Sequence, residues 1–255
     1  MRLKSIIGWL VFSVTLFTLK TSAQGTSGFE ILRLQIYPRG SSLAGAVIAD
    51  AGNIESIFYN PAGLGIIHQK TATAGYMNYL LGIQSGYLAY AAPLPILGIW
   101  GTSISYTNYG TFDGRSATGE ELSDFSANDL VFGLSYANVV GSRLAIGASA
   151  KFAHSSIENY TGSALAFDLG AQYTFIPQRL IVGAGIFNLG WTTKAYVNHR
   201  DHLPLYYRIG VFGEPEGLPA NLYFTMTLHQ DKADQYSLAS NSENELTNIF
   251  EEIYY

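Results

Sequence analysis

Nine segments of this chain alternate between large apolar residues and residues that are small or polar. Residues 164–176, for example, read ALAFDLGAQYTFI, with bulky side chains at alternate positions. Successive side chains of a β-strand point to opposite faces. The pattern therefore predicts an all-β fold whose strands each have one bulky apolar face and one small or polar face. We expect strands at 71–81, 83–92, 97–112, 128–140, 144–157, 164–176, 180–191, 205–213 and 221–230.

The small or polar face carries too little charge for a surface that meets water. Charged residues make up 13% of the chain, about half the share usual in soluble domains. On this face only Lys151, Asp168 and Arg208 stand out as isolated charges. In a soluble sandwich the large apolar residues face inward and the outer face is charged. We therefore expect the reverse arrangement, a transmembrane antiparallel β-barrel with its bulky face toward lipid and its small face around a crowded interior.

Strand lengths and aromatic residues agree with a membrane-spanning barrel. A tilted strand crosses the hydrocarbon layer with about 9–11 residues. Aromatic side chains favour the membrane interface, and here they gather near the predicted strand ends: Tyr106, Tyr109, Phe112, Tyr136, Tyr160, Tyr173, Phe175 and Trp191.

The connections predict an up-and-down barrel. Short turns at 140–143 and 177–179 join some strands, whereas polar links at 113–127 and 192–204 join others, and residues 155–162 extend a third link. The three longer links would all lie on one side. This arrangement fits outer-membrane barrels, which have short periplasmic turns and longer outer loops.

Residues 39–65, RGSSLAGAVIADAGNIESIFYNPAGLG, do not alternate. Apolar residues recur at roughly helical spacing as far as Asn60-Pro61, where proline lacks a donor and disfavours the helical region for Asn60. Gly63 and Gly65 then allow a tight turn. A compact apolar segment ahead of a series of strands predicts either a plug inside a barrel or a surface helix-turn on an ordinary β domain.

The first 23 residues are typical of a secretory signal peptide. Arg2 and Lys4 precede a mostly apolar run at 6–19, and Thr21-Ser22-Ala23 offers a small-residue cleavage site. A retained membrane anchor is the alternative, but the run is shorter than the span of about 20 residues that a helix needs. We therefore expect a mature protein that works outside the cytoplasm.

Three stretches ahead of the first predicted strand resemble the start of the PorV/PorQ family of Bacteroidetes-type outer-membrane proteins. They are GTSGFEILRL at 25–34, PRGSSLAGAVIAD at 38–50 and IFYNPAGL at 57–64. That family is related in architecture to FadL-type long-chain fatty-acid transporters. The resemblance implies a FadL-like barrel of about fourteen strands closed by an N-terminal plug.

The resemblance also assigns parts of the chain. Residues 24–68 would form the plug, or hatch, and residues 69–255 the barrel. The residues that match the plug motif are Arg39, ahead of the small-residue run, and Asn60, Pro61 and Gly63 in the hatch turn.

The chain departs from the family pattern in two places. The usual Gly-Gly reads Ala44-Gly45, and the family continues with several strands beyond the nine expected here. Residues 240–255 are acidic and do not alternate cleanly. Either the chain is truncated or it closes a smaller barrel. Because exposed strand edges are not tolerated in lipid, we expect the barrel to be incomplete at the C-terminus.

The resemblance implies a non-enzymatic binding or scaffold role in type IX protein secretion and surface attachment. The location would be the outer membrane of a Gram-negative, Bacteroidetes-type bacterium. The expected partners are outer-membrane lipid, secreted cargo proteins and other secretion-system components. The alternative is a FadL-like passive transporter whose ligand is a hydrophobic compound. A soluble periplasmic β protein with enzymatic or lectin-like activity is a third hypothesis.

The residues indicate no catalytic, cofactor or metal site. Cysteine is absent, and a net charge of -5 gives no basic surface for nucleic acid. His199 and His202 lie close together without a third ligand nearby. Lys151, Asp168 and Arg208 are expected to share the interior, where they could line a pathway or fix the plug by ion pairs, because buried charges are usually paired.

Overall fold

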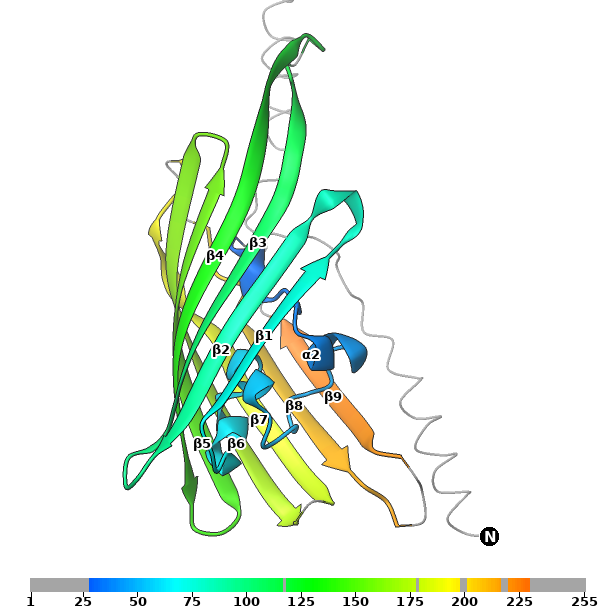
Figure 1. Ribbon diagram of the computed structural model, residues 1–255, viewed down its shortest axis with the longest axis vertical. Helices are drawn as coiled ribbons and strands as arrows, with labels where there is room; N and C mark the ends of the chain where they lie inside the picture. The colour runs from blue at the N-terminus through cyan, green and yellow to red at the C-terminus, as the bar shows by residue number, and fades with distance from the viewer. Residues whose placement is uncertain (1–27, 117, 178, 198–200, 217–219, 230–255) are drawn as a thin grey trace, which may run out of the picture. The chain divides into compact units, whose positions relative to one another are not determined.

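The computed structural model describes residues 28–116, 118–177, 179–197, 201–216 and 220–229. Nine strands form one antiparallel sheet in which each strand pairs with its neighbours in the sequence (Figure 1). They are β1 (Thr71–Asn78), β2 (Gln84–Leu94), β3 (Gly98–Arg115), β4 (Glu121–Val140), β5 (Leu144–Ile157), β6 (Tyr160–Ile176), β7 (Leu180–Lys194), β8 (Tyr206–Gly213) and β9 (Leu222–His229). Each strand overlaps one expected segment, so the prediction of an all-β fold is confirmed.

Residues 28–70, called the N-terminal segment below, form short helical turns joined by irregular chain. These are η1 (Glu30–Leu32), α2 (Pro38–Ser42), η2 (Ile54–Phe58) and η3 (Pro61–Ile66), of which only α2 is α-helical and the others are 3₁₀. A further 3₁₀ turn, η4 (Leu80–Gly82), lies between β1 and β2. Within the described ranges, no helix is both long and apolar enough to cross a membrane.

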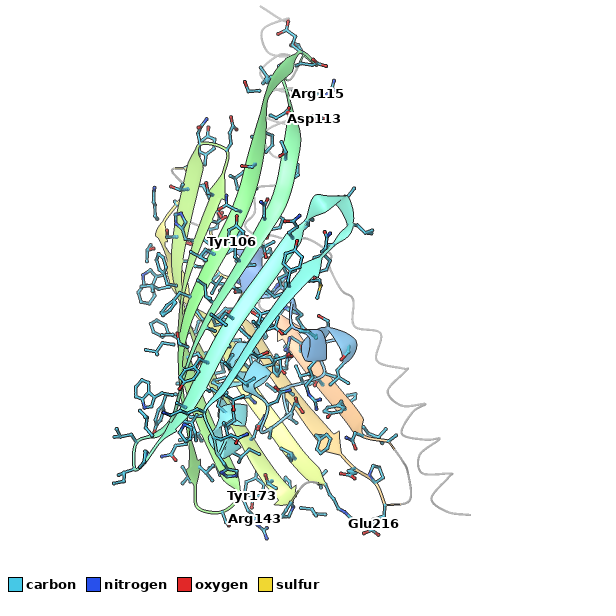
Figure 2. The ribbon with its side chains drawn as sticks, in the orientation of Figure 1. Tyr106, Asp113, Arg115, Arg143, Tyr173 and Glu216 are labelled. Carbon is cyan, nitrogen blue, oxygen red and sulfur yellow. The ribbon has the colours of Figure 1, made fainter. Side chains whose placement is uncertain are left out.

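The prediction of a long polar link at 113–127 is wrong, because most of these residues belong to the paired strands β3 and β4. β3 and β4 continue as a hairpin beyond the ends of β2 and β5, with Asp113 and Arg115 near its tip (Figure 2). Polar residues do not prevent strand pairing where both faces of a hairpin meet solvent, and Phe112 stacks on Phe125 with ring centroids 5.3 Å apart. The link expected at 155–162 is likewise only a tight turn between β5 and β6.

The described strands form an open sheet. β1 pairs with β2 and β9 pairs with β8, but β1 and β9 do not pair with each other. Residues 1–27, which include the expected signal peptide, lie outside the described residues, and so do residues 230–255. Closure into a barrel therefore stays a prediction.

The two faces of the sheet are arranged as the sequence predicts. Large side chains on one face, called the bulky face, are exposed: Leu134 by 47%, Phe167 by 39% and Phe224 by 58%. The other face, called the small face, is buried, and Asp168 and Gln172 are exposed by only 1% and 2%. The bulky side chains therefore do not meet in a dry centre.

The N-terminal segment covers the small face of the sheet (Figure 1). Ile57 and Leu64 belong to one hydrophobic cluster with Ala137 of β4, and Leu32 belongs to another with Ala166 of β6. The small residues of this face are therefore buried by another part of the chain, and the segment packs on the small face and not on the bulky face.

Candidate functional site

The candidate site is the interface between the N-terminal segment and the small face. Four glycines of the small face lie against the segment: Gly147 of β5, Gly170 of β6, Gly183 of β7 and Gly210 of β8. The backbone of the segment lies over Gly147 and Gly183, and its side chains lie over Gly170 and Gly210. A Cβ on Gly147 would overlap the backbone of Pro61, and a Cβ on Gly183 would overlap the carbonyl group of Ile48. Glycine in a strand interior allows this kind of close backbone approach. The glycines pair across strands, Gly147 with Gly170 and Gly183 with Gly210, so they form two flat patches.

Asn60 and Pro61 form the turn between η2 and η3. Asn60 is fully buried; its Oδ1 accepts a hydrogen bond from the N–H of Ala62 at 3.1 Å, and its Nδ2 donates to the carbonyl oxygen of Ile48 at 2.6 Å. Pro61 is the first residue of η3, where the missing N–H leaves no donor unsatisfied. The stop predicted at Asn60-Pro61 is confirmed, since η2 ends at Phe58 and Asn60 is extended.

Gly63 is enclosed by the segment itself. A Cβ at this position would lie 2.5 Å from Ser56 Oγ and 2.8 Å from the carbonyl oxygen of Asp50. Its N–H donates to the carbonyl oxygen of Asn60 at 3.0 Å, and its own carbonyl accepts from Gly52 at 2.9 Å. Both backbone groups are therefore paired in a space that admits no side chain.

Arg39 connects the segment to the edge strand β9. Its Nε lies 2.5 Å from Asp50 Oδ2 and its Nη2 lies 2.8 Å from Asp50 Oδ1, a bidentate pair. The same Nη2 donates to the hydroxyl of Tyr223 at 3.0 Å. The hydrogen bond with Asp50 raises the pKa of Arg39 above its already high ordinary value, so the charge is fixed. The arginine thus fixes a loop of the segment against the sheet.

Gln172 forms a contact between the sheet and the segment that the sequence pattern did not predict. Its Nε2 donates to the carbonyl oxygens of Ile48 and Asp50, both at 2.9 Å, from a buried position on β6. These hydrogen bonds satisfy two backbone acceptors of the segment where it passes over the sheet. The available signal was a long amide side chain on a face otherwise made of small residues.

Lys151 and Asp168 form a buried ion pair. Lys151 Nζ lies 2.7 Å from Asp168 Oδ2 and 2.8 Å from Oδ1 of Asn188. Asn188 lies in a β-bulge and has a φ angle of 60°, a conformation that asparagine adopts more readily than most residues. Its N–H donates to Asp168 Oδ1 at 2.9 Å, and its Nδ2 lies 3.4 Å from the carbonyl oxygen of Leu32 in the N-terminal segment. The contacts of Asn188 were not predicted from the sequence, although this residue interrupts the alternation of β7.

Arg208 does not join this ion pair. Its Nε donates to Thr227 Oγ1 at 3.1 Å, and its guanidinium carbon lies 4.9 Å from the ring centroid of Tyr206. Lys151 and Arg208 nevertheless line the same narrow cavity beneath the N-terminal segment. The three charges predicted to share the interior therefore separate into one ion pair and one arginine with hydroxyl and aromatic contacts.

The contacts of this site bind and position chain segments. Among the described residues, no group of three or more His, Cys, Asp or Glu side chains is placed to hold a metal ion. His199 lies outside the described residues, so the expectation that His199 and His202 form no metal site stays untested.

The sequence was also compared with protein-family models and with curated proteins. Neither comparison gives a match.

Proposed function

We propose that the chain is an outer-membrane β-barrel protein of the PorV/PorQ type whose N-terminal segment is the plug. Its role would be non-enzymatic: a binding and scaffold component linked to type IX protein secretion and surface attachment. The observation that carries the membrane part of the proposal is the exposure of the bulky face from β2 to β9, while the small face is buried on the central strands and half-buried on the edge strands β1 and β9. The secretion part rests on the resemblance of residues 25–64 to that family.

The bulky face is better suited to lipid than to water. Contiguous apolar patches on soluble monomers rarely exceed a few hundred Å². Here the exposed apolar side chains continue from Leu88 on β2 to Leu228 on β9. Tyr173 is exposed near the end of β6, as expected for an aromatic residue at a membrane interface (Figure 2).

The contacts of the N-terminal segment favour a scaffold over an open pathway. Arg39, Gln172 and Asn188 each link the segment to the sheet through side-chain hydrogen bonds. Opening a path along the small face would break all three links and expose the Lys151–Asp168 pair. The protruding β3–β4 hairpin is the natural contact element for a partner protein, because it lies beyond the neighbouring strands (Figure 1).

A passive transporter of hydrophobic compounds is the second candidate. The observation in its favour is an apolar groove of about 450 Å³ across β6 to β9, lined by residues such as Leu169, Ile186 and Met226. In a membrane, this groove could receive an apolar molecule from the side of the sheet.

The membrane proposal is tested by placing arginine on each of two exposed leucines. Leu134 lies on the bulky face of β4, whereas Leu122 lies on the protruding hairpin and is exposed by 57%. In lipid, Leu134→Arg should cost about 2–4 kcal/mol near the bilayer midplane, and it should sharply reduce the protein recovered folded from outer-membrane fractions. Leu122→Arg should be tolerated. Equal tolerance of both substitutions in a protein that stays in solution without detergent would refute the proposal.

The two functions are separated by different measurements. A scaffold should capture secretion components or cargo from detergent extracts, and deleting residues 110–125 should abolish the capture while leaving the folded fraction unchanged. A transporter should instead give ligand-dependent uptake into vesicles reconstituted with the full chain. Uptake without capture would replace the first proposal by the second.

A further inference from the structure

A narrow cavity lies between the N-terminal segment and the small face of β3, β4, β5 and β8. Its volume is about 40 Å³, room for a few water molecules or one small ion. Polar and charged side chains in its wall include Arg33, Tyr59, Ser103, Ser105, Lys151 and Arg208. No aspartate or glutamate is among the described residues that line it.

The charges around the cavity do not cancel. Lys151 is paired with Asp168, and Arg33 Nε lies 3.0 Å from a carboxylate oxygen of Glu30. Arg208 has no carboxylate at ion-pair distance within the described part of the chain. One positive charge, on the half-buried Arg208, is therefore left over in the wall of the cavity.

An arginine cannot remove this imbalance by losing its proton, because the guanidinium group stays protonated in proteins. A charge withdrawn from water is costly unless it is paired and hydrogen-bonded. Arg208 has five N–H donors, and the contact to Thr227 uses only Nε. The planar guanidinium group is suited to bidentate binding of oxyanions.

Tyr59 supplies an independent sign of a missing ligand. It is exposed by only 4%, it lines the cavity, and its hydroxyl has no hydrogen-bond partner among the described residues. A buried polar group without a partner costs about 1–3 kcal/mol. An acceptor bound in the cavity would remove this cost.

We propose that the cavity binds a small tetrahedral oxyanion of the phosphate or sulfate class. The guanidinium group of Arg208 supplies the main charge, while Lys151 offers the third of its N–H donors, two being used by Asp168 and Asn188. The hydroxyl groups of Tyr59 and of Ser103 on β3 complete the site. An anion there would bridge the segment and the sheet. The inference depends on the interface alone and does not rest on the proposed membrane or secretion role.

The test measures anion binding to the purified full chain in detergent micelles. Isothermal titration with sodium phosphate and with sodium sulfate, at constant ionic strength maintained with chloride, should give one site per chain. Arg208→Gln should weaken binding by about tenfold or more, a change of about 1.4 kcal/mol. Arg143→Gln is the matched control, because Arg143 is an exposed arginine in the turn between β4 and β5 and does not line the cavity (Figure 2). It should bind like the unmodified protein.

Tyr59→Phe provides a second variant that keeps the ring and every apolar contact. Tyr59→Phe should weaken anion binding by several-fold without changing the circular dichroism spectrum. If Arg208→Gln does not fold, the binding measured with Tyr59→Phe tests the proposal. The proposal is overturned if neither anion binds. It is also overturned if binding survives unchanged in Arg208→Gln and Tyr59→Phe, or if Arg143→Gln weakens it equally.

Discussion

Replacing Gly183 with alanine tests whether close backbone contact holds the N-terminal segment on the sheet. The added Cβ would overlap the carbonyl oxygen of Ile48, and it would lie 2.7 Å from the carbonyl carbon of Ile48 and 2.9 Å from Ala49 Cα. Favourable contacts lie at about 3.5–4.0 Å, so the segment must move away by roughly 1 Å. Every atom it meets is backbone, and no change of side-chain rotamer can relieve the overlap.

The cost follows from the contacts that this movement disturbs. Overpacking of this kind costs about 1–3 kcal/mol. The same Ile48 carbonyl accepts from Asn60 at 2.6 Å and from Gln172 at 2.9 Å, and weakening one of these bonds adds about 0.5–1.5 kcal/mol. Alanine also stabilises the folded state by about 0.4–1 kcal/mol, because it reduces the conformational entropy of the unfolded chain. We therefore expect the free energy of opening the segment to fall by about 2 kcal/mol, which increases the equilibrium constant for opening by about 30-fold.

Hydrogen exchange of the full chain in detergent measures this opening directly. In Gly183→Ala, amides of the N-terminal segment should exchange about 30-fold faster than in the unmodified protein, whereas the amides of β3 and β4 should change little. Gly213→Ala is the matched control, since Gly213 lies on β8 with no heavy atom within 4 Å of the added Cβ. Equal exchange of the segment in both variants would refute the close-contact argument.

Three further predictions concern the same interface. Lys151→Met should lower stability by about 3–5 kcal/mol in denaturant titrations because it leaves Asp168 buried and unpaired, and adding Asp168→Leu should recover most of the loss. Asn60→Ala should cost about 1–3 kcal/mol by the same measurement because it removes the partners of Ile48 and Ala62; a change within error would contradict the capping role. Burial raises the pKa of Tyr59 above its ordinary value, so stability should be intact below about pH 10 and fall at higher pH as the unfolded tyrosine ionises. Tyr59→Phe should make the fall in melting temperature with rising pH less steep. An unchanged slope would show that ionisation of Tyr59 does not cause the fall.

The strands could be predicted because their signal is local. Alternation with a period of two residues is set by the strand itself, and it gave all nine strands and the correct exposed face. The β3–β4 hairpin was not predicted in full, because residues 113–127 are polar on both faces. Burial on one face is what produces alternation, and this part of the hairpin has no buried face of its own.

The interface could be predicted only in part. The turn at Asn60-Pro61 follows from proline stereochemistry, which acts between adjacent residues. The partner of Arg39 on β9, Tyr223, is 184 residues away in the sequence, and the partner of Gln172, Ile48, is 124 residues away. Such pairings depend on which strand lies opposite which part of the segment, and the sequence pattern of either element contains no information on this.

The composition of the small face is itself a consequence of the N-terminal segment. A sheet that fills its interior with its own side chains needs bulky residues on the inner face. Here the small-face positions nearest the segment are glycines such as Gly147 and Gly183, and the space above them is filled by the backbone at Ile48 and Pro61. Without the segment, these positions could not close the gap, because glycine has no side chain to move into it. The segment therefore belongs to the core of this fold, and any displacement of the segment from the small face must carry the energetic cost of leaving that core unfilled.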